Sequence, residues 1–299
     1  MNKKLKIFSI LTTIGMMIVL LQGALVTKTE SGEGCGDSWP LCHGQVIPES
    51  INTVETMIEY SHRIVSSLLG IMVITLAIWM WRTLPHKRET KFLAIISILF
   101  IIFQGLLGAA AVMWGQSSAV LALHFGFSLV SFASVLLLTL LIFEEDQTHK
   151  ATSSQITKKF KLFIYFLFTY LYIVVYTGAL VRHTGSSLAC VGWPLCNGQL
   201  IPSLTTTTIA VQFGHRFLAG LLFLIILATA IHVYRHYKDQ KTLRYTVFIS
   251  LILVTAQVLS GAYVIFTQLS LLSAMLHALL ITCLFGAISY LVMLATRTK

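Results

Sequence analysis

Residues 39–45 read Trp-Pro-Leu-Cys-His-Gly-Gln, and residues 193–199 read Trp-Pro-Leu-Cys-Asn-Gly-Gln. The two stretches lie 154 positions apart, and further matches follow each of them at a spacing of 153. The further matches pair His62 with His215, Gln104 with Gln257, Gly108 with Gly261 and His124 with His277. The sequence therefore predicts a duplicated chain with halves 1–150 and 151–299, joined by a linker rich in Ser, Thr, Gln and Lys.

The rest of the chain is strongly apolar, with 56% hydrophobic and 11% charged residues. Soluble domains carry about 25% charge, so a water-soluble globule is excluded, as is a disordered or nucleic-acid-binding chain despite the net charge of +10. A membrane span needs about 20 apolar residues. The first apolar run follows three lysines but lacks a small-residue cleavage site, so we expect a retained helix rather than a signal peptide. Eight segments qualify as spans: 7–26, 62–81, 92–113, 120–143, 160–181, 213–234, 245–266 and 272–295.

The basic residues predict the orientation of this all-α polytopic protein. Eight spans place both termini on one side, and with cytoplasmic termini 17 of the 21 Lys and Arg residues lie inside. This is the positive-inside pattern. We therefore expect a multi-pass protein of the cell membrane, surrounded by lipid, whose two large loops lie on the extracytoplasmic side. Because four is an even number, the two four-helix bundles have the same orientation and form a parallel repeat.

Four of the ten histidines combine helical placement with repetition: His62, His124, His215 and His277. Each is expected in the first turns at the outer end of its helix. An imidazole there binds a metal, moves protons or hydrogen-bonds a neighbouring helix. Two imidazoles alone do not complete a zinc or copper site, whereas two that face each other across a bundle suit the axial positions of a haem iron. The pattern predicts one haem site in each half.

The residues around His62 and His215 differ between the halves. Glu59 lies one helical turn before His62, and Gln212 occupies the equivalent position. A carboxylate can transfer a proton or stabilise a developing cation, and an amide cannot. The first half is therefore predicted to hold the reacting group and the second an electron-transfer or structural haem; the alternative is that Glu59 is an interfacial surface acid. Arg63 and Arg216, which follow the two histidines, are candidates for haem propionate contacts or for lipid headgroup contacts.

Two cysteine pairs lie in the predicted outer loops, Cys35 with Cys42 and Cys190 with Cys196. The oxidising compartment permits a disulfide within each loop. A structural cross-link is one interpretation, and a redox-active disulfide that passes electrons is the other. The first pair is the better redox candidate because its loop is acidic.

Together these features closely resemble those of haem A synthases, of the type found in Gram-positive bacteria, over nearly the whole chain. The segments that carry the resemblance are His62-Arg63, Ala122-Leu123-His124-Phe125-Gly126, Arg182-His183-Thr184 and Gly214-His215-Arg216. No single one of these motifs is specific, but their combination is.

The resemblance implies an activity and roles for the site residues. Haem A synthases oxidise one ring methyl of farnesylated haem O to a formyl group by successive hydroxylations, which gives haem A for cytochrome oxidase. By position, His62 and His124 would bracket haem O, and Glu59 would assist the oxidation. His215 and His277 would hold a haem b that relays electrons. The implied partners are haem O synthase (protohaem farnesyltransferase) as substrate supplier and a membrane electron donor such as quinol.

Two other functions remain open from the residues alone. A di-haem cytochrome b that exchanges electrons with quinol would use the four histidines but leaves Glu59 unexplained. A membrane thiol-disulfide oxidoreductase would use the outer cysteines but lacks a Cys-x-x-Cys motif and leaves the histidines without a role. Transport is disfavoured because the helix interiors lack charges.

Overall fold

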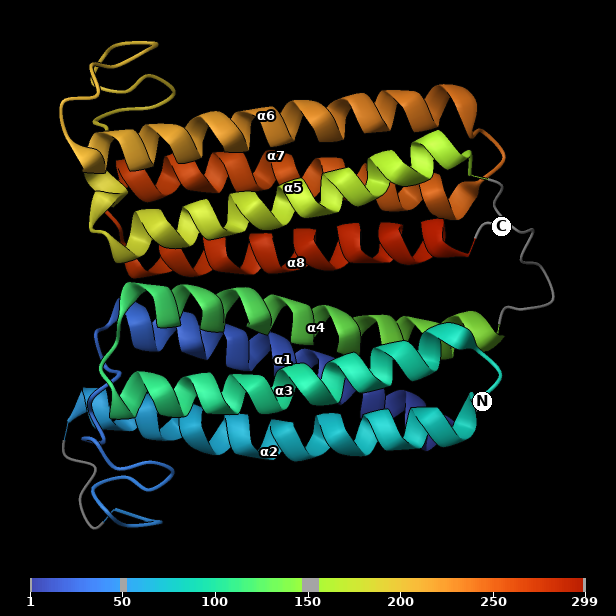
Figure 1. Cartoon of the computed structure of the whole chain (residues 1–299), viewed down its shortest axis with the longest axis horizontal. Helices are drawn as coiled ribbons and strands as arrows, with labels where there is room; N and C mark the ends of the chain where they lie inside the picture. The colour runs from blue at the N-terminus through green and yellow to red at the C-terminus, as the bar shows by residue number, and fades with distance from the viewer. Residues whose placement is uncertain (1, 49–52, 147–155, 298–299) are drawn as a thin grey trace. The chain divides into compact units, whose positions relative to one another are not determined.

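The computed structural model describes residues 2–48, 53–146 and 156–297 (Figure 1). Eight of its helices are long and apolar enough to span a membrane, and the regular structure among these residues is otherwise one 3-10 turn and isolated bridges. The prediction of an all-helical multi-pass membrane protein is confirmed. The elements are α1 (Lys3–Lys28), α2 (Val54–Thr83), α3 (Arg88–Met113), α4 (Ser118–Asp146), α5 (Lys158–His183), η1 (Ser186–Leu188), α6 (Thr207–His236), α7 (Lys241–Phe266) and α8 (Leu271–Thr296).

The chain divides into two compact units, Met1–Ala151 and Thr152–Lys299. The linker boundary predicted between residues 150 and 151 lies outside the described residues. In the first unit, α1 and α3 each pack against both α2 and α4. In the second unit, α5 and α7 each pack against both α6 and α8 (Figure 1). Each unit is therefore an antiparallel four-helix bundle in which α2 lies diagonally opposite α4, and α6 opposite α8.

The helices that carry the histidine pairs begin earlier than their apolar runs predict. α2 begins at Val54 rather than at 62, and α6 begins at Thr207 rather than at 213. Threonine caps explain the extension, because the Thr53 hydroxyl accepts from Thr56 N at 3.1 Å and the Thr206 hydroxyl accepts from Ile209 N at 3.3 Å. Hydropathy alone does not detect such polar, capped turns. The expectation that His62 and His215 lie in the first turns was wrong, since both lie about two turns inside their helices.

The outward faces of both bundles carry large apolar side chains, as lipid-facing helices require. Examples are Leu11 on α1, Phe92 on α3 and Phe248 on α7, all more than half exposed. Such surfaces would be anomalous in water but match the hydrocarbon of a bilayer. Inside the first bundle, the hydroxyls of Thr13 and Thr139 lie 2.8 Å apart and join α1 to α4.

Candidate functional site

The four repeated histidines form one pair in each bundle. His62 of α2 and His124 of α4 come from diagonally opposite helices and lie close enough to interact electrostatically. The same holds for His215 of α6 and His277 of α8. All four imidazoles are half-buried. The structure therefore brings together the residues that the sequence pairs.

A glycine on the neighbouring helix lies against each imidazole. An added Cβ at Gly178 would lie 3.0 Å from Cε1 of His215, which is tighter than ordinary contact. An added Cβ would lie 3.4 Å from Cε1 of the histidine at two other positions, Gly23 against His62 and Gly261 against His277. At Gly108 the distance to Cε1 of His124 would be 3.8 Å. These close approaches explain why the same glycines recur in both halves.

The donor set in each bundle suits a haem. In the described part of the chain, no three His, Cys, Asp or Glu side chains gather as a metal-binding group, so a bare ion would find too few ligands. A porphyrin supplies four nitrogens itself and asks the protein for two axial groups. Within the same part of the chain, Nδ1 of His62 and Nδ1 of His124 are buried without a hydrogen-bond partner.

Two hydroxyl groups that the sequence analysis did not single out contact the second histidine pair. Thr177 Oγ1 lies 2.9 Å from Nδ1 of His215, and Ser260 Oγ lies 2.8 Å from Nδ1 of His277. Gln257 also contributes, with its amide nitrogen 3.1 Å from Nε2 of His277. Comparison of the halves offers a signal for the two hydroxyls, because the equivalent positions hold Gln22 and Leu107.

Each cysteine pair forms a disulfide that closes a short loop. The S–S distance is 2.04 Å for Cys35–Cys42 and 1.97 Å for Cys190–Cys196. Cys283 of α8 is a half-buried free thiol. Within each loop an isolated β-bridge joins the backbone of the second cysteine to that of a glutamine three residues later. The two loops therefore share one backbone pattern.

Glu59 is buried between the first disulfide loop and its own helix, with 3% of its surface exposed. Its Oε2 accepts a hydrogen bond from Cys35 N at 2.8 Å. Its Oε1 pairs with Arg63, whose Nε donates at 3.0 Å and whose Nη2 also donates. The carboxylate is therefore fixed and fully engaged on both oxygens, which contradicts its alternative reading as an interfacial surface acid.

The second half repeats this arrangement without the charge. Gln212 is equally buried, and its Oε1 accepts from Cys190 N while its Nε2 donates to Ser187 O at 2.5 Å. Arg216 is not bonded to Gln212, and its Nε is buried without a partner among the described residues. Gln212 thus keeps the second disulfide loop attached to α6, whereas the ion pair between Glu59 and Arg63 belongs to the first half.

Both arginines bind the disulfide loops through Nη1. Arg63 donates to Ser38 O at 2.6 Å and to Leu41 O at 2.5 Å. Arg216 donates to the equivalent carbonyls, Gly192 O at 2.9 Å and Leu195 O at 3.0 Å. The sequence did not reveal this role, because a backbone carbonyl group is present at every residue whatever its type. Contact of either arginine with haem propionates stays a prediction.

Comparison with known proteins adds a family to this geometry. The family model described as "Cytochrome oxidase assembly protein" matches residues 6–289. The chain is 56% identical over 300 residues to the haem A synthase of Geobacillus kaustophilus, covering all of this chain and 94% of the relative. It is 50% identical to that of Alkalihalophilus pseudofirmus, covering 99% of each, and 52% identical to that of Bacillus licheniformis, covering all of this chain and 98% of the relative. On this full-length similarity, the chain belongs to the cytochrome oxidase assembly protein family, in which the relatives named here are haem A synthases.

Proposed function

We propose that this protein oxidises a ring methyl of haem O to the formyl group of haem A, with the reaction in its N-terminal half. The observation that carries the proposal is the pair of matched histidine sites of which the first alone has a buried carboxylate beside it, Glu59. A duplicated electron carrier has no need for that difference. The membrane setting also suits a substrate with a farnesyl chain, since the sites lie within bundles whose outer faces meet lipid.

The two histidine pairs have different tasks in this proposal. His62 and His124 hold and orient haem O as substrate. His215 and His277 hold a haem b, which when bound supplies one-electron transfer. The glycines leave room for each imidazole at its Cε1 atom, where a larger side chain would crowd the ring.

Glu59 acts as the proton-handling group. Arg63 forms an ion pair with the carboxylate of Glu59 and holds it in place. A fixed carboxylate one turn from His62 can accept a proton released at the edge of haem O or stabilise positive charge that develops there. Gln212, which holds the second loop, can do neither.

The protein's surroundings follow from the same proposal. The positive-inside pattern supports the cell membrane with cytoplasmic termini and extracytoplasmic disulfide loops. The substrate comes from haem O synthase, electrons are exchanged with a membrane donor such as quinol, and haem A is delivered for assembly of cytochrome oxidase.

Pigment analysis tests the proposed reaction. The full chain is co-expressed with haem O synthase in a host that lacks its own haem A synthase, and the extracted haems are separated by chromatography and mass. We expect haem A and the hydroxylated derivative of haem O, beside haem b. Haem b with unmodified haem O alone would contradict the synthase and favour the di-haem carrier.

A different variant distinguishes the proposed haem A synthase from a membrane thiol-disulfide oxidoreductase. Replacing Cys35 and Cys42 together with Ser removes the first disulfide, which would abolish thiol oxidation of an added dithiol completely. The proposal instead expects haem b to stay bound in this variant, because the first disulfide lies in the first unit and His215 and His277 lie in the second.

A further inference from the structure

The hydrogen bonds at the second histidine pair fix which ring nitrogen carries the proton. A hydroxyl group has a single hydrogen to donate. Thr177 Oγ1 lies 2.7 Å from Val174 O, and Ser260 Oγ lies 2.8 Å from Gln257 O. Because a carbonyl oxygen can only accept, each hydroxyl donates there and must accept from its imidazole. Nδ1 of His215 and of His277 is therefore protonated.

The opposite nitrogen of each ring then carries the lone pair. At His277 the Gln257 amide also lies beside the ring, with its nitrogen 3.1 Å from the ring Nε2, and an iron bound at that nitrogen would take the place of this contact. Both rings of the second pair are thus held in the tautomer whose Nε2 can bind iron. The orientation of each ring is fixed by the same contact.

The first histidine pair has no hydroxyl partner of this kind among the described residues, although the backbone of Gln104 interacts with the ring of His124. Nδ1 of His62 and Nδ1 of His124 have no partner among the described residues. The positions equivalent to Thr177 and Ser260 hold Gln22 and Leu107. Leucine cannot accept a hydrogen bond, and the buried Oε1 of Gln22 is itself without a partner in the described chain. The two sites therefore differ in how firmly they fix their imidazoles.

We propose that Thr177 and Ser260 are positioning residues, whose contacts let the second site retain its haem permanently. The first site has no equivalent hydroxyls, and the haem that it binds can therefore exchange. The inference rests on the proposed function, since it assigns haem b to His215 and His277. A hydrogen bond from Nδ1–H makes an imidazole a stronger donor to a metal, and losing such a partner typically lowers metal affinity by 10–100-fold. A site that releases product after each turnover gains from weaker ligation.

The test uses purified full-length protein and two readouts that do not depend on turnover. Thr177→Val and Ser260→Ala are each expected to lower retention of haem b against a competing haem-binding protein by about 10–100-fold. A roughly tenfold loss of preference for ferric over ferrous haem would raise the midpoint potential by about 59 mV. Thr177→Ser restores the hydroxyl and should restore both values. Leu107→Ala, at the position equivalent to Ser260, should leave the potential of haem b unchanged.

The outcomes separate this inference from the proposed function. If Thr177→Val and Ser260→Ala bind haem b with the potential and retention of the original protein, the two hydroxyls do not position the ligands and the inference is overturned. If the original protein holds no haem at His215 and His277, the proposed function has failed instead. If Thr177→Ser behaves like Thr177→Val although both fold, packing rather than the hydroxyl is responsible, which also overturns the inference.

A second observation concerns a groove between α6 and α7, near the end of α6 and the start of α7. The groove has a volume of about 750 Å³. Apolar residues such as Ile231, Val247 and Leu251 line most of it. Its polar lining comes from Tyr234, Arg235, Lys241, Arg244 and Tyr245.

The cations in this groove are not neutralised by the protein. Among the described residues, Arg235, Lys241 and Arg244 form no ion pair with an acidic side chain. Arg244 is held in place instead, with its guanidinium 5.3 Å from the centre of the Tyr234 ring and Nη1 donating to Lys238 O at 3.1 Å. Three positive charges therefore remain available to an anion beside an apolar channel that faces lipid.

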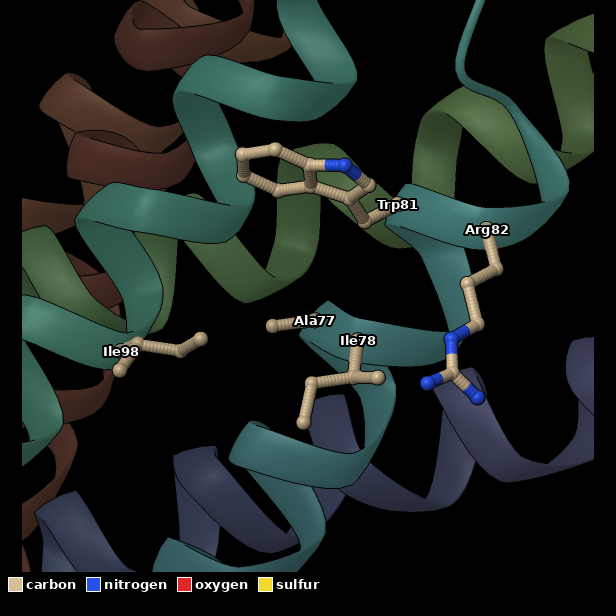
Figure 2. Close-up of a pocket in the computed structure, with 5 residues that line it drawn as sticks. All are labelled: Ala77, Ile78, Trp81, Arg82 and Ile98. Atoms are coloured by element: carbon tan, nitrogen blue, oxygen red, sulfur yellow. The ribbon is translucent and has the colours of Figure 1, made fainter.

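The equivalent groove in the first half is lined by fewer cations, although the basic positions repeat: Arg82, Arg88 and Lys91 match Arg235, Lys241 and Arg244 at a spacing of 153. Figure 2 shows its lining residues, Ala77, Ile78, Trp81, Arg82 and Ile98, which match the second groove at a spacing of 153. It is smaller, at about 210 Å³, and Arg82 is its single cationic lining residue. The basic positions are thus shared by both halves, and the second half differs in having a larger groove that all three of its cations line.

We infer that the α6–α7 groove binds an anionic membrane phospholipid, with its acyl chain along the apolar lining and its phosphate at Arg235, Lys241 and Arg244. Basic pockets between membrane helices bind anionic headgroups in this way. Tyr234 and Tyr245 suit the headgroup level, where amphipathic rings are favoured. A neutral ligand such as a quinol would leave the three charges without a partner.

Native mass spectrometry of the full-length protein tests the inference, with phosphatidylglycerol and phosphatidylcholine as probes. The original protein is expected to retain phosphatidylglycerol in preference to phosphatidylcholine. The combined variant Arg235→Gln, Lys241→Gln and Arg244→Gln should lower that retention roughly tenfold or more, since each cation near the headgroup adds attraction. The combined variant Arg82→Gln, Arg88→Gln and Lys91→Gln, at the equivalent positions of the first half, is the matched control and should change little. Equal retention of the two lipids, or unchanged retention in the combined variant, would overturn the inference.

Discussion

Replacing Glu59 with Gln is expected to stop formation of haem A while leaving the fold and the bound haem b intact. Gln212 shows why the fold should survive, because a glutamine in the same place already accepts from the backbone of a disulfide loop. Arg216 likewise keeps its carbonyl bonds without an acidic neighbour. The variant therefore removes the charge and the proton chemistry but few of the structural contacts.

We expect the rate of haem O oxidation to fall by about 10²–10⁴-fold, the range usual for loss of a general acid or base. Extracted pigments and single-turnover conversion of haem O measure the effect. Gln212→Glu is the matched control, since it places a carboxylate beside Arg216 in the other half and should leave haem A output unchanged. Undiminished haem A output from Glu59→Gln would remove Glu59 from the reaction, and recovery of output in the double variant would show that the two halves are not specialised.

Replacing His215 or His277 with Ala is expected to remove haem b from the purified protein. Each substitution would delete one of the two proposed axial ligands, and the remaining imidazole could not hold the iron in a six-coordinate state. The low-spin haem b spectrum should fall to about a tenth or less of the original, measured by the reduced-minus-oxidised difference spectrum per mole of protein.

Two other histidine variants separate ligation from general damage to the second bundle. His232 also lies on α6 but stacks on His236 and makes a tilted ring contact with Phe160, so His232→Ala should keep the haem b spectrum. His62→Ala should keep it as well, because it alters only the first site. Survival of the haem b signal in both His215→Ala and His277→Ala, or its loss in His62→Ala, would show that the halves are assigned wrongly.

The disulfide loops illustrate how far residue types alone could lead. The repeated Trp-Pro-Leu-Cys stretches and the Glu59/Gln212 difference were visible without a structure. The attachment of both loops to the helices below them was not. It depends on Glu59, Gln212 and the two arginines reaching backbone N–H and C=O groups of the loops, and the backbone offers the same groups at nearly every residue.

Sequence by itself determined the number and type of the spans, the duplication and the positions of the four histidines. Hydropathy is a local property of about 20 consecutive residues, and a repeat is visible wherever matching residues keep their spacing. Only the tertiary structure decided what each imidazole contacts: a glycine against Cε1 of every ring, and, among the described residues, Thr177 and Ser260 at the second pair alone. Those contacts depend on the rotation of each helix about its own axis against its neighbours. Helices as uniformly apolar as these leave little periodic signal from which that rotation could be predicted.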